Sequence, residues 1–380
     1  MKNYIYKYRE ANIRKYLLVS LLIFLGIFSL AKSSLAAPSV SSVSGIASDG
    51  QNITIFGSGF GTNGPNILFF DNFESGTVGQ DLKIGPGSAT IGQWAGLNTV
   101  HPKYSSGTTV SGNKVFKVTS VAGIEGQTNA EISLPNVTET FMSWWCYVPS
   151  DSPWSGDEAG NNFNWKIMWI MQSDSADNDM YFAKFVNQTT HIIGGNNSPL
   201  PYPDTEPWQS SSMAKGTWHR YWWWMKDGYS NDGNIKLWEL TATGPVQVKN
   251  VVNKTTLFPS SFRKKLSVNG YTKKMTYTQA TQMFDDVYVA TGPNAQARVE
   301  IGNAPTYTSS TNLTLATINI WSDTSISAIV RSGSFASGQA YLYVFDANGS
   351  INANGYPITF DGGAPPDTTP PSAPTGLSVI

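Results

Sequence analysis

Short runs of alternating apolar and polar residues, many of them aromatic, recur along the chain from residue 37 onward. Gly, Asn, Asp and Pro separate these runs. A period of two residues is typical of strands, and turn formers at short intervals are typical of sandwiches and barrels. The runs predict strands at 53–56, 67–70, 114–119, 131–134, 141–148, 164–171, 180–186, 218–226, 235–240, 283–290, 297–301, 326–330, 339–346 and 358–360. The chain is therefore expected to be all-β.

The first 36 residues have the pattern of a secretory signal peptide. Five basic residues lie within residues 1–15, an apolar run follows at 16–31, and small residues precede the expected cleavage point after Ala36. The run is shorter than the about 20 residues that a membrane-spanning helix needs, and an anchor is the alternative interpretation. The sequence predicts an exported protein, extracellular or at the cell surface. It shows no second apolar run of spanning length in the mature chain.

Charge and cysteine content narrow the function classes. The chain has 25 Lys+Arg and 26 Asp+Glu residues, and removal of residues 1–36 takes away six basic residues and one acidic residue, which leaves a net charge of -6. No basic field for nucleic acid is present, so nucleic acid is excluded as a partner. A single cysteine excludes an internal disulfide framework and a multi-cysteine zinc site. Cys146 is expected to be a small buried apolar side chain.

The two ends of the mature chain carry a second pattern. Residues 52–61 place Gly57, Gly59 and Gly61 after a short strand, where a bend needs backbone conformations that side chains disfavour. Together with 38–45, this segment resembles the opening of an IPT/TIG module, a family of Ig-like β-sandwiches. The segments that resemble later strands of that family are 299–305, 318–326, 341–345 and 356–360.

This resemblance implies a domain order. One discontinuous Ig-like IPT/TIG domain would comprise 38–66 plus 298–361, with another domain inserted at 67–297. The alternative is an N-terminal stub followed by a separate C-terminal sandwich. Residues 362–380 are a Pro-rich linker with a stretch that resembles the start of a fibronectin type III module. Such modules are extracellular spacers.

The inserted region is compositionally distinct, because 12 of the 13 tryptophans lie between Trp94 and Trp238. It opens with the sequence ILFFDNFE at 67–74, closes with FDDVYVA at 284–290, and contains GTWHRYWWWMK at 216–226. These motifs resemble concanavalin A-like (LamG-type) jelly rolls. The resemblance implies a carbohydrate-binding module, a glycoside hydrolase or a polysaccharide lyase, and the fold alone does not choose among them.

Strand parity indicates which side chains of this region could meet a ligand. Alternate side chains of 218–226 point to opposite faces, so Arg220 and Lys226 share one face with three tryptophans. Two buried cations would need partners, so this face is expected to border a solvent groove while the other fills the core. Lys166 is expected to join it. Aromatic rings suit sugar rings, and cations suit uronic carboxylates or sulfates. The predicted glycan-binding residues are Lys166, Arg220, Trp222, Trp224 and Lys226.

The catalytic motifs disfavour a hydrolase and leave a lyase open. A glycosidase needs two carboxyl groups about 5–9.5 Å apart, and the E-x-D-x-E pattern of jelly-roll hydrolases is absent, which disfavours a hydrolase. A lyase needs a cation or amide near the uronic carboxylate and a Tyr or His base. The candidates are Lys166, Gln172, Tyr181, His191, His219, Arg220, Lys226 and Tyr271. The Gln-x-His motif of jelly-roll lyases is missing, and His219 has the opposite parity to Arg220.

Carboxylates at the two ends of the inserted region suggest a metal. If its first and last strands are neighbours, four carboxylates come together, and Ca²⁺ takes several oxygen ligands. The candidate ligands of a structural Ca²⁺ are Asp71, Glu74, Asp285 and Asp286. No other cofactor is indicated.

The sequence thus predicts a large concanavalin A-like jelly-roll sandwich inserted in a smaller Ig-like sandwich. The leading function is recognition of an extracellular polysaccharide, plausibly anionic, through an aromatic and cationic face. The alternative is a polysaccharide lyase that cleaves a uronic-acid polymer by β-elimination. A third interpretation is a structural adhesin or spacer without glycan specificity, in which the tryptophans lie wholly in the core.

Overall fold

The protein is described here from a computed structural model. The described residues are 36–121, 129–152, 165–172, 179–184, 190–196, 208–209, 213–257, 261–272, 279–335 and 337–360. Within these ranges the chain is strand and connecting loop, apart from one 3-10 turn, η1 (Tyr307–Ser309). The expected all-β sandwich class is confirmed. The predicted signal peptide and the linker at 362–380 lie outside the described residues, except for Ala36. Within the described residues, no helix is long and apolar enough to cross a membrane.

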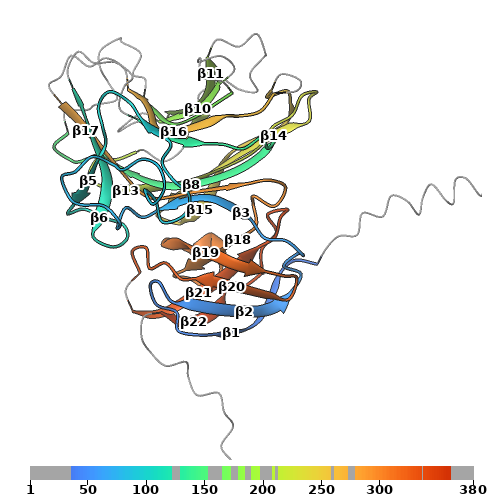
Figure 1. The fold of residues 1–380 in the computed structure, drawn as a ribbon. Helices are drawn as coiled ribbons and strands as arrows, with labels where there is room; N and C mark the ends of the chain where they lie inside the picture. Colours follow the sequence, from blue (N-terminus) through green and yellow to red (C-terminus); the bar gives the residue numbers. More distant parts are fainter. Residues whose placement is uncertain are drawn as a thin grey trace, which may run out of the picture. The chain divides into compact units, whose positions relative to one another are not determined.

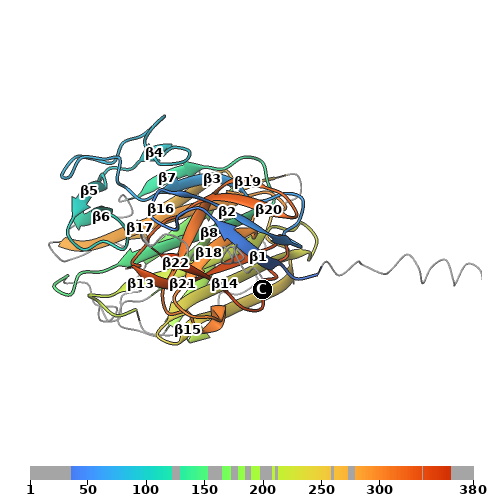
Figure 2. The same ribbon diagram turned by 90° about the horizontal axis from the view of Figure 1, so that it is seen from below.

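The smaller sandwich is built from both ends of the described chain. Its strands are β1 (Ser39–Ser44), β2 (Asn52–Ser58), β18 (Arg298–Gly302), β19 (Leu313–Trp321), β20 (Ser325–Ile329), β21 (Gly338–Phe345) and β22 (Tyr356–Phe360), hydrogen-bonded in the order β1-β2-β20-β19-β18-β21-β22. In β2, Ile53 pairs with Ala328 and Ile55 with Ile326 of β20. Figures 1 and 2 show the blue strand β2 beside the orange β20. Segments about 270 residues apart thus lie side by side, and both isoleucines are buried in the small core.

The larger sandwich has two sheets. One contains, in spatial order, β15 (Gly244–Lys254), β14 (Gly233–Thr241), β13 (Trp218–Lys226), β8 (Glu139–Tyr147), β17 (Gln279–Thr291), β6 (Lys114–Val121) and β5 (Lys103–Ser106), with β3 (Asn66–Asp71) also paired to β17. The other contains β12 (Trp208–Gln209), β11 (Thr190–Asn196), β10 (Asp179–Lys184), β9 (Trp165–Met171), β16 (Lys265–Thr272), β7 (Ala130–Ser133) and β4 (Gly96–Leu97). We call them the eight-stranded and the seven-stranded sheet.

Apolar side chains from both sheets fill the space between them. From β13, one parity set enters this core, as predicted: Tyr221, Trp223 and Met225 are buried in it. From the seven-stranded sheet, Ile170 and Val268 meet the same core. Cys146 is also fully buried there, which confirms the expectation for it. The regular alternation of the sequence therefore places one face of each sheet in the core and leaves two outer faces.

The outer face of the eight-stranded sheet is covered by the smaller sandwich. A separate apolar cluster joins the two sandwiches. Its buried members are Phe70, Phe141, Trp222, Trp224, Tyr288 and Ala290 from the larger sandwich and Ala295, Leu313 and Leu315 from the connection and β19. The outer face of the seven-stranded sheet contributes no residue to this cluster.

Candidate functional site

The outer face of the seven-stranded sheet is shaped by a bulge between β9 and β16. Val268 pairs with Met168 and Tyr271 pairs with Lys166, so two residues of β16 face one residue of β9. Asn269, in the bulge, has a φ of 54°, a left-handed conformation that asparagine tolerates better than most residues. A bulge of this kind re-aims the side chains of its strand.

An irregularity in β9 itself moves Lys166 to the outer face, because Phe182 of β10 pairs with Met168 and Ala183 pairs with Lys166, which leaves Ile167 as an extra residue of β9. Ile167, Met168 and Ile170 all lie in the core, whereas Lys166 Nζ lies 4.0 Å from the centroid of the Trp169 ring. Lys166 and Trp169 therefore share a face although they are three residues apart. Strict alternation along 164–171 would place Lys166 on the same face as Met168 and Ile170, but alternation stops at the extra residue Ile167. Lys166 is only 2% exposed.

Polar side chains surround this pair. Asn129 Nδ2 donates a hydrogen bond to Ser267 Oγ at 3.0 Å, and Ser267 pairs with Trp169 in the register of β16 and β9. Asn129 and Ser267 are both buried. Within the described part of the chain, Asn129 Oδ1 is buried without a hydrogen-bond partner. We call Asn129, Lys166, Trp169 and Ser267 the Lys166 cluster.

Two tyrosines and an ion pair lie at neighbouring register positions. The backbone of Tyr271 pairs with Lys166, and that of Tyr181 in β10 pairs with Trp169. Further along the same face, Lys265 Nζ lies 3.0 Å from Glu131 Oε1, and both side chains are partly exposed. The candidates for lyase chemistry from β9, β10 and β16 thus converge on one region of one sheet.

The remaining lyase candidates are dispersed. His191 lies in β11, where its backbone pairs with Lys184 of β10 and Trp208 of β12. Gln172 follows the last residue of β9. His219 is in the other sheet, and its Nε2 lies 3.0 Å from the carbonyl oxygen of Ala214. That contact gives His219 a structural role within its own hairpin region.

Arg220 does not line an open groove, which corrects the prediction from the sequence. It is 1% exposed, donates through Nη1 to the Leu313 carbonyl at 2.6 Å, and donates through Nε to Ser143 Oγ at 3.3 Å. Its Nη2 lies 3.4 Å from Glu300 Oε2. The cation has the buried partners that the sequence argument assumed to be missing, and two of them, Leu313 and Glu300, come from the smaller sandwich.

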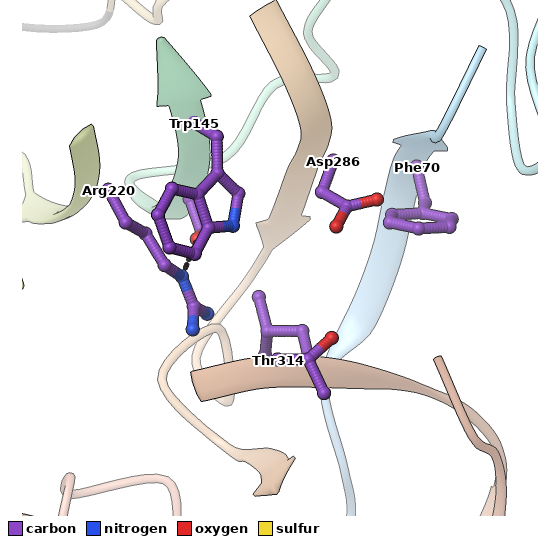
Figure 3. Close-up of a pocket in the computed structure, with 7 residues that line it drawn as sticks. Phe70, Trp145, Arg220, Asp286 and Thr314 are labelled. Atoms are coloured by element: carbon purple, nitrogen blue, oxygen red, sulfur yellow. Dashed lines mark hydrogen bonds between the residues drawn. The ribbon is translucent and has the colours of Figure 1, made fainter. Parts of the chain in front are cut away.

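Figure 3 shows the small cavity beside this arginine. Arg220, Trp145, Asp286, Phe70 and Thr314 stand around it, and its volume is about 10 Å³, room for one water molecule. The cavity is too small for a sugar ring. It is a gap in the packing between the two sandwiches.

The other predicted glycan-binding residues of β13 are also displaced from solvent, with one exception. Trp222 and Trp224 are 1% and 6% exposed and belong to the cluster between the sandwiches. Trp224 Nε1 donates to Glu139 Oε1 at 3.0 Å. Lys226, at the end of the strand, is exposed. The five predicted residues therefore do not form one surface, because Lys166 belongs to the opposite outer face.

Sequence reasoning missed the acidic partner of this interface. Glu300 is fully buried and accepts a hydrogen bond from Arg298 Nε at 2.5 Å and one from the Tyr307 hydroxyl at 3.3 Å. The available signal was its place in β18, flanked by two apolar residues of opposite parity that enter the small core.

The four predicted calcium ligands already accept hydrogen bonds from N–H and O–H groups of the protein. Asp71 accepts hydrogen bonds from Trp94 Nε1 and Phe73 N at 2.8 and 2.9 Å. Glu74 Oε1 accepts two backbone N–H groups at 2.7 Å. Asp285 accepts three backbone N–H groups, from residues 110, 111 and 286. Ser111 donates to Asp286. Among the described residues, no group of three or more His, Cys, Asp or Glu side chains is placed to hold a metal.

Burial changes the protonation of these carboxyl groups. Loss of hydration raises the pKa of Asp71 to about 7, against the two hydrogen bonds that lower it. Loss of hydration likewise raises the pKa of Asp286 to about 6, and it raises the pKa of the adjacent Asp285 well above its usual value. A carboxyl group that is readily protonated at neutral pH is a poor ligand for Ca²⁺.

Comparisons with known proteins give no family for the chain. No protein-family model matches it, and no curated protein matches it. The IPT/TIG and LamG resemblances therefore stay expectations.

Solved structures do match, 49 chains in all. An endo-β-1,4-glucuronan lyase from the fungus Trichoderma reesei is 16% identical, with a TM-score of 0.41, over 60% of this chain and 98% of that one. A mutant of alginate lyase Aly36B in complex with an alginate tetrasaccharide is 12% identical, with a TM-score of 0.44, over 61% and 98%. A third is cellulose induced protein Cip1, 14% identical, with a TM-score of 0.38, over 59% and 97%.

Proposed function

We propose that the protein cleaves a uronic-acid polysaccharide by β-elimination at the outer face of the seven-stranded sheet. The observation that carries this proposal is the Lys166 cluster: a buried cation lies over the Trp169 ring. Ser267, the register partner of Trp169, accepts a hydrogen bond from the Asn129 amide, whose oxygen lacks a partner among the described residues. The sequence ranked catalysis second to binding, because the Gln-x-His motif is missing and His219 has the opposite parity to Arg220. With Arg220 assigned to the interface, the lyase becomes the better interpretation.

The reaction needs three groups. A base removes the proton from C5 of the uronate, next to its carboxyl group. The C4–O glycosidic bond then breaks, its electron pair stays on the leaving oxygen, and a proton transfers to that oxygen. A C4=C5 double bond remains in the sugar. A cation or amide that neutralises the carboxylate stabilises the negative charge that develops on it.

Residues of the Lys166 cluster and of β16 are our candidates for these groups. Lys166 would pair with the uronate carboxylate, since a cation in a partly desolvated site attracts an anion far more strongly than one in water. The Asn129 amide would hydrogen-bond to the sugar, and Trp169 would pack against the apolar side of the ring. We assign the base to Tyr271, on the ground that its backbone is paired with that of Lys166.

The localisation of the substrate is part of the proposal. The signal peptide predicted at 1–36 would deliver the enzyme outside the cell, where such polymers occur. The substrate is thus an extracellular polysaccharide rich in uronic acid.

A spectroscopic assay tests the proposed function. The protein is incubated with a panel of uronate polymers, and the ultraviolet absorbance of the unsaturated product is followed. Lys166→Ala and Tyr271→Phe are expected to lower the initial rate by about 10²–10⁴-fold, the usual contribution of a positioned acid–base group. Lys226→Ala is the matched control, because Lys226 is exposed on the other sheet.

Three results would be informative. If Tyr181→Phe forms no product and Tyr271→Phe keeps full activity, the site stays as proposed and the base is Tyr181. Binding of a polymer without any unsaturated product would overturn the lyase and leave a binding module. Equal rates for the parent and Lys166→Ala would show that the catalytic site does not lie at the Lys166 cluster.

A further inference from the structure

A groove opens along the edge of the contact between the two sandwiches. Its volume is about 260 Å³, close to the lower end of the range for ligand pockets, about 300 Å³. Residues of β13, β14 and β15 form one wall, and residues of β18, η1 and β21 form the other. Among the residues that line the groove are Trp222, Lys236, Trp238, Gln247, Arg298 and Asn348. This groove is separate from the Lys166 cluster, which lies on the opposite sheet.

The first wall is an aromatic row that ends in an amide. Trp222 pairs with Trp238 across β13 and β14, and Trp238 pairs with Gln247 across β14 and β15. Trp238 is partly exposed and Gln247 is exposed. Cross-strand partners lie on one face of a sheet, so the two rings and the amide are contiguous.

One group in this wall lacks a partner. Trp222 is 1% exposed, and its Nε1 is buried without a hydrogen-bond acceptor among the described residues. An N–H donor left unpaired inside a protein is destabilising, because it has lost its hydrogen bond to water. A ligand oxygen that reaches the bottom of the groove would satisfy it.

The charge in the groove is positive. Lys236 Nζ lies 5.0 Å from the Trp224 ring centroid, and none of the ion pairs between described residues uses Lys236. Arg298 lines the groove and pairs with Glu300. Two cations against one carboxylate leave a net positive charge. Asn348, exposed on the second wall, adds an amide.

From these observations we infer that the groove is a second, non-catalytic binding site for an acidic saccharide. Trp238 stacks on the sugar ring, the Trp222 N–H and the Gln247 and Asn348 amides bind hydroxyl groups, and Lys236 pairs with the carboxylate or sulfate. The inference goes beyond the proposed function and does not depend on it. Because the groove and the Lys166 cluster lie on opposite outer faces, the groove would hold a polymer chain near the enzyme and raise its local concentration.

The test is a set of binding isotherms with a short oligouronate and with the same oligosaccharide after reduction of its carboxyl groups. Trp238→Ala is expected to weaken binding of both by about tenfold or more, which equals about 1.4 kcal/mol. Lys236→Ala is expected to weaken binding of the acidic oligosaccharide alone. Lys254→Ala, an exposed lysine at the end of β15, is the control and should bind like the parent.

Two additions make the outcome decisive. The Gln247→Ala/Asn348→Ala double variant removes only exposed side chains, so it tests the groove even if Trp238→Ala fails to fold. Lys166→Ala separates the two sites. Binding kept in Lys166→Ala and lost in the groove variants supports the inference whether or not the protein is a lyase. Binding lost in Lys166→Ala and kept in the groove variants overturns it, as does parent-like affinity in all of them.

Discussion

What a charged side chain of this protein can bind depends on the segments that pack against it. Arg220 has the chemistry of an anion-binding residue, yet the Glu300 carboxylate and the Leu313 carbonyl already occupy its donors. Lys166 was predicted from the same reasoning and lies in a quite different setting, over Trp169. Residue type indicated the chemistry, whereas partners contributed by distant segments decided its use.

Arg220→Ala is expected to lower the free energy of unfolding by about 3–5 kcal/mol, because it leaves Glu300 with one cation fewer in a buried site. Lys226→Ala, on the same face of the same strand but exposed, should stay within about 0.5 kcal/mol of the parent. Urea denaturation of both variants measures the difference. A stability loss for Arg220→Ala no larger than that for Lys226→Ala would contradict a buried ion pair between Arg220 and Glu300.

Asp71 should make stability depend on pH. Its pKa is about 7 in the folded protein because of burial, and about 3.9 in the unfolded chain. Between these values the folded state binds more protons, so the free energy of unfolding falls as pH rises, by up to about 1.4 kcal/mol per pH unit. The contribution is therefore present at pH 4 and lost by pH 8.

Asp71→Asn cannot titrate and should flatten this part of the profile. Thermal unfolding of parent and variant at closely spaced pH values between 4 and 8 measures it. Asp151→Asn, at an exposed position, is the control and should keep the parent's slope. Identical slopes for parent and Asp71→Asn would show that Asp71 is ionised throughout.

At the scale of single elements, the extra residue Ile167 of β9 lets Lys166 face outward, and it lies opposite the bulge in β16. Gly270 lies in this bulge, and a Cβ there would come 2.5 Å from Trp169 Cβ. The bulge thus needs a residue without a side chain where the strand passes the Lys166 cluster. A one-residue change in register moves a side chain to the opposite face.

Gly270→Ala is expected to displace Trp169, to lower stability by about 1–3 kcal/mol, and to reduce the rate of β-elimination together with it. Gly96→Ala is the matched control in the same sheet, because its Cβ would meet only the flexible Glu131 carboxylate, at 3.3 Å. Melting curves and initial rates of both variants test this. A Gly270→Ala variant with parent-like stability and rate would show that the bulge does not position the cluster.

The sequence predicted most strands and the core set of β13 because a period of two is local information. It predicted no strand at β16 and therefore no bulge there, since Asn269-Gly270 within that run also fits a turn. It also did not predict the burial of Trp222 and Trp224, because the residues that cover them, such as Leu313 and Leu315, lie about 90 positions further along the chain. Local patterns set the elements, and long-range packing decided which faces stay exposed.

At the scale of the whole molecule, the two sandwiches share buried contacts. The apolar cluster around Trp222 and Leu315 and the ion pair of Arg220 with Glu300 both cross from one sandwich to the other. Separation of the two would expose large aromatic side chains and leave buried charges without partners. Such an interface resembles a core more than a hinge.

Calorimetry should therefore show one unfolding transition, with equal calorimetric and van't Hoff enthalpies. Arg220→Ala should move the whole transition to lower temperature without splitting it. Two separated transitions in the parent protein would mean that the sandwiches unfold independently and that the shared contacts are weak.

If this protein breaks uronate polymers by elimination, as we propose, the masses of the released oligosaccharides will distinguish that reaction from hydrolysis. Elimination adds no water, so one fragment of each cleaved bond carries an unsaturated uronate end and lacks the mass of one water molecule relative to a hydrolysis product. We expect such fragments from the parent protein and none from Lys166→Ala. Fragments that all carry an added water, or a polymer that stays intact across the panel, would contradict it.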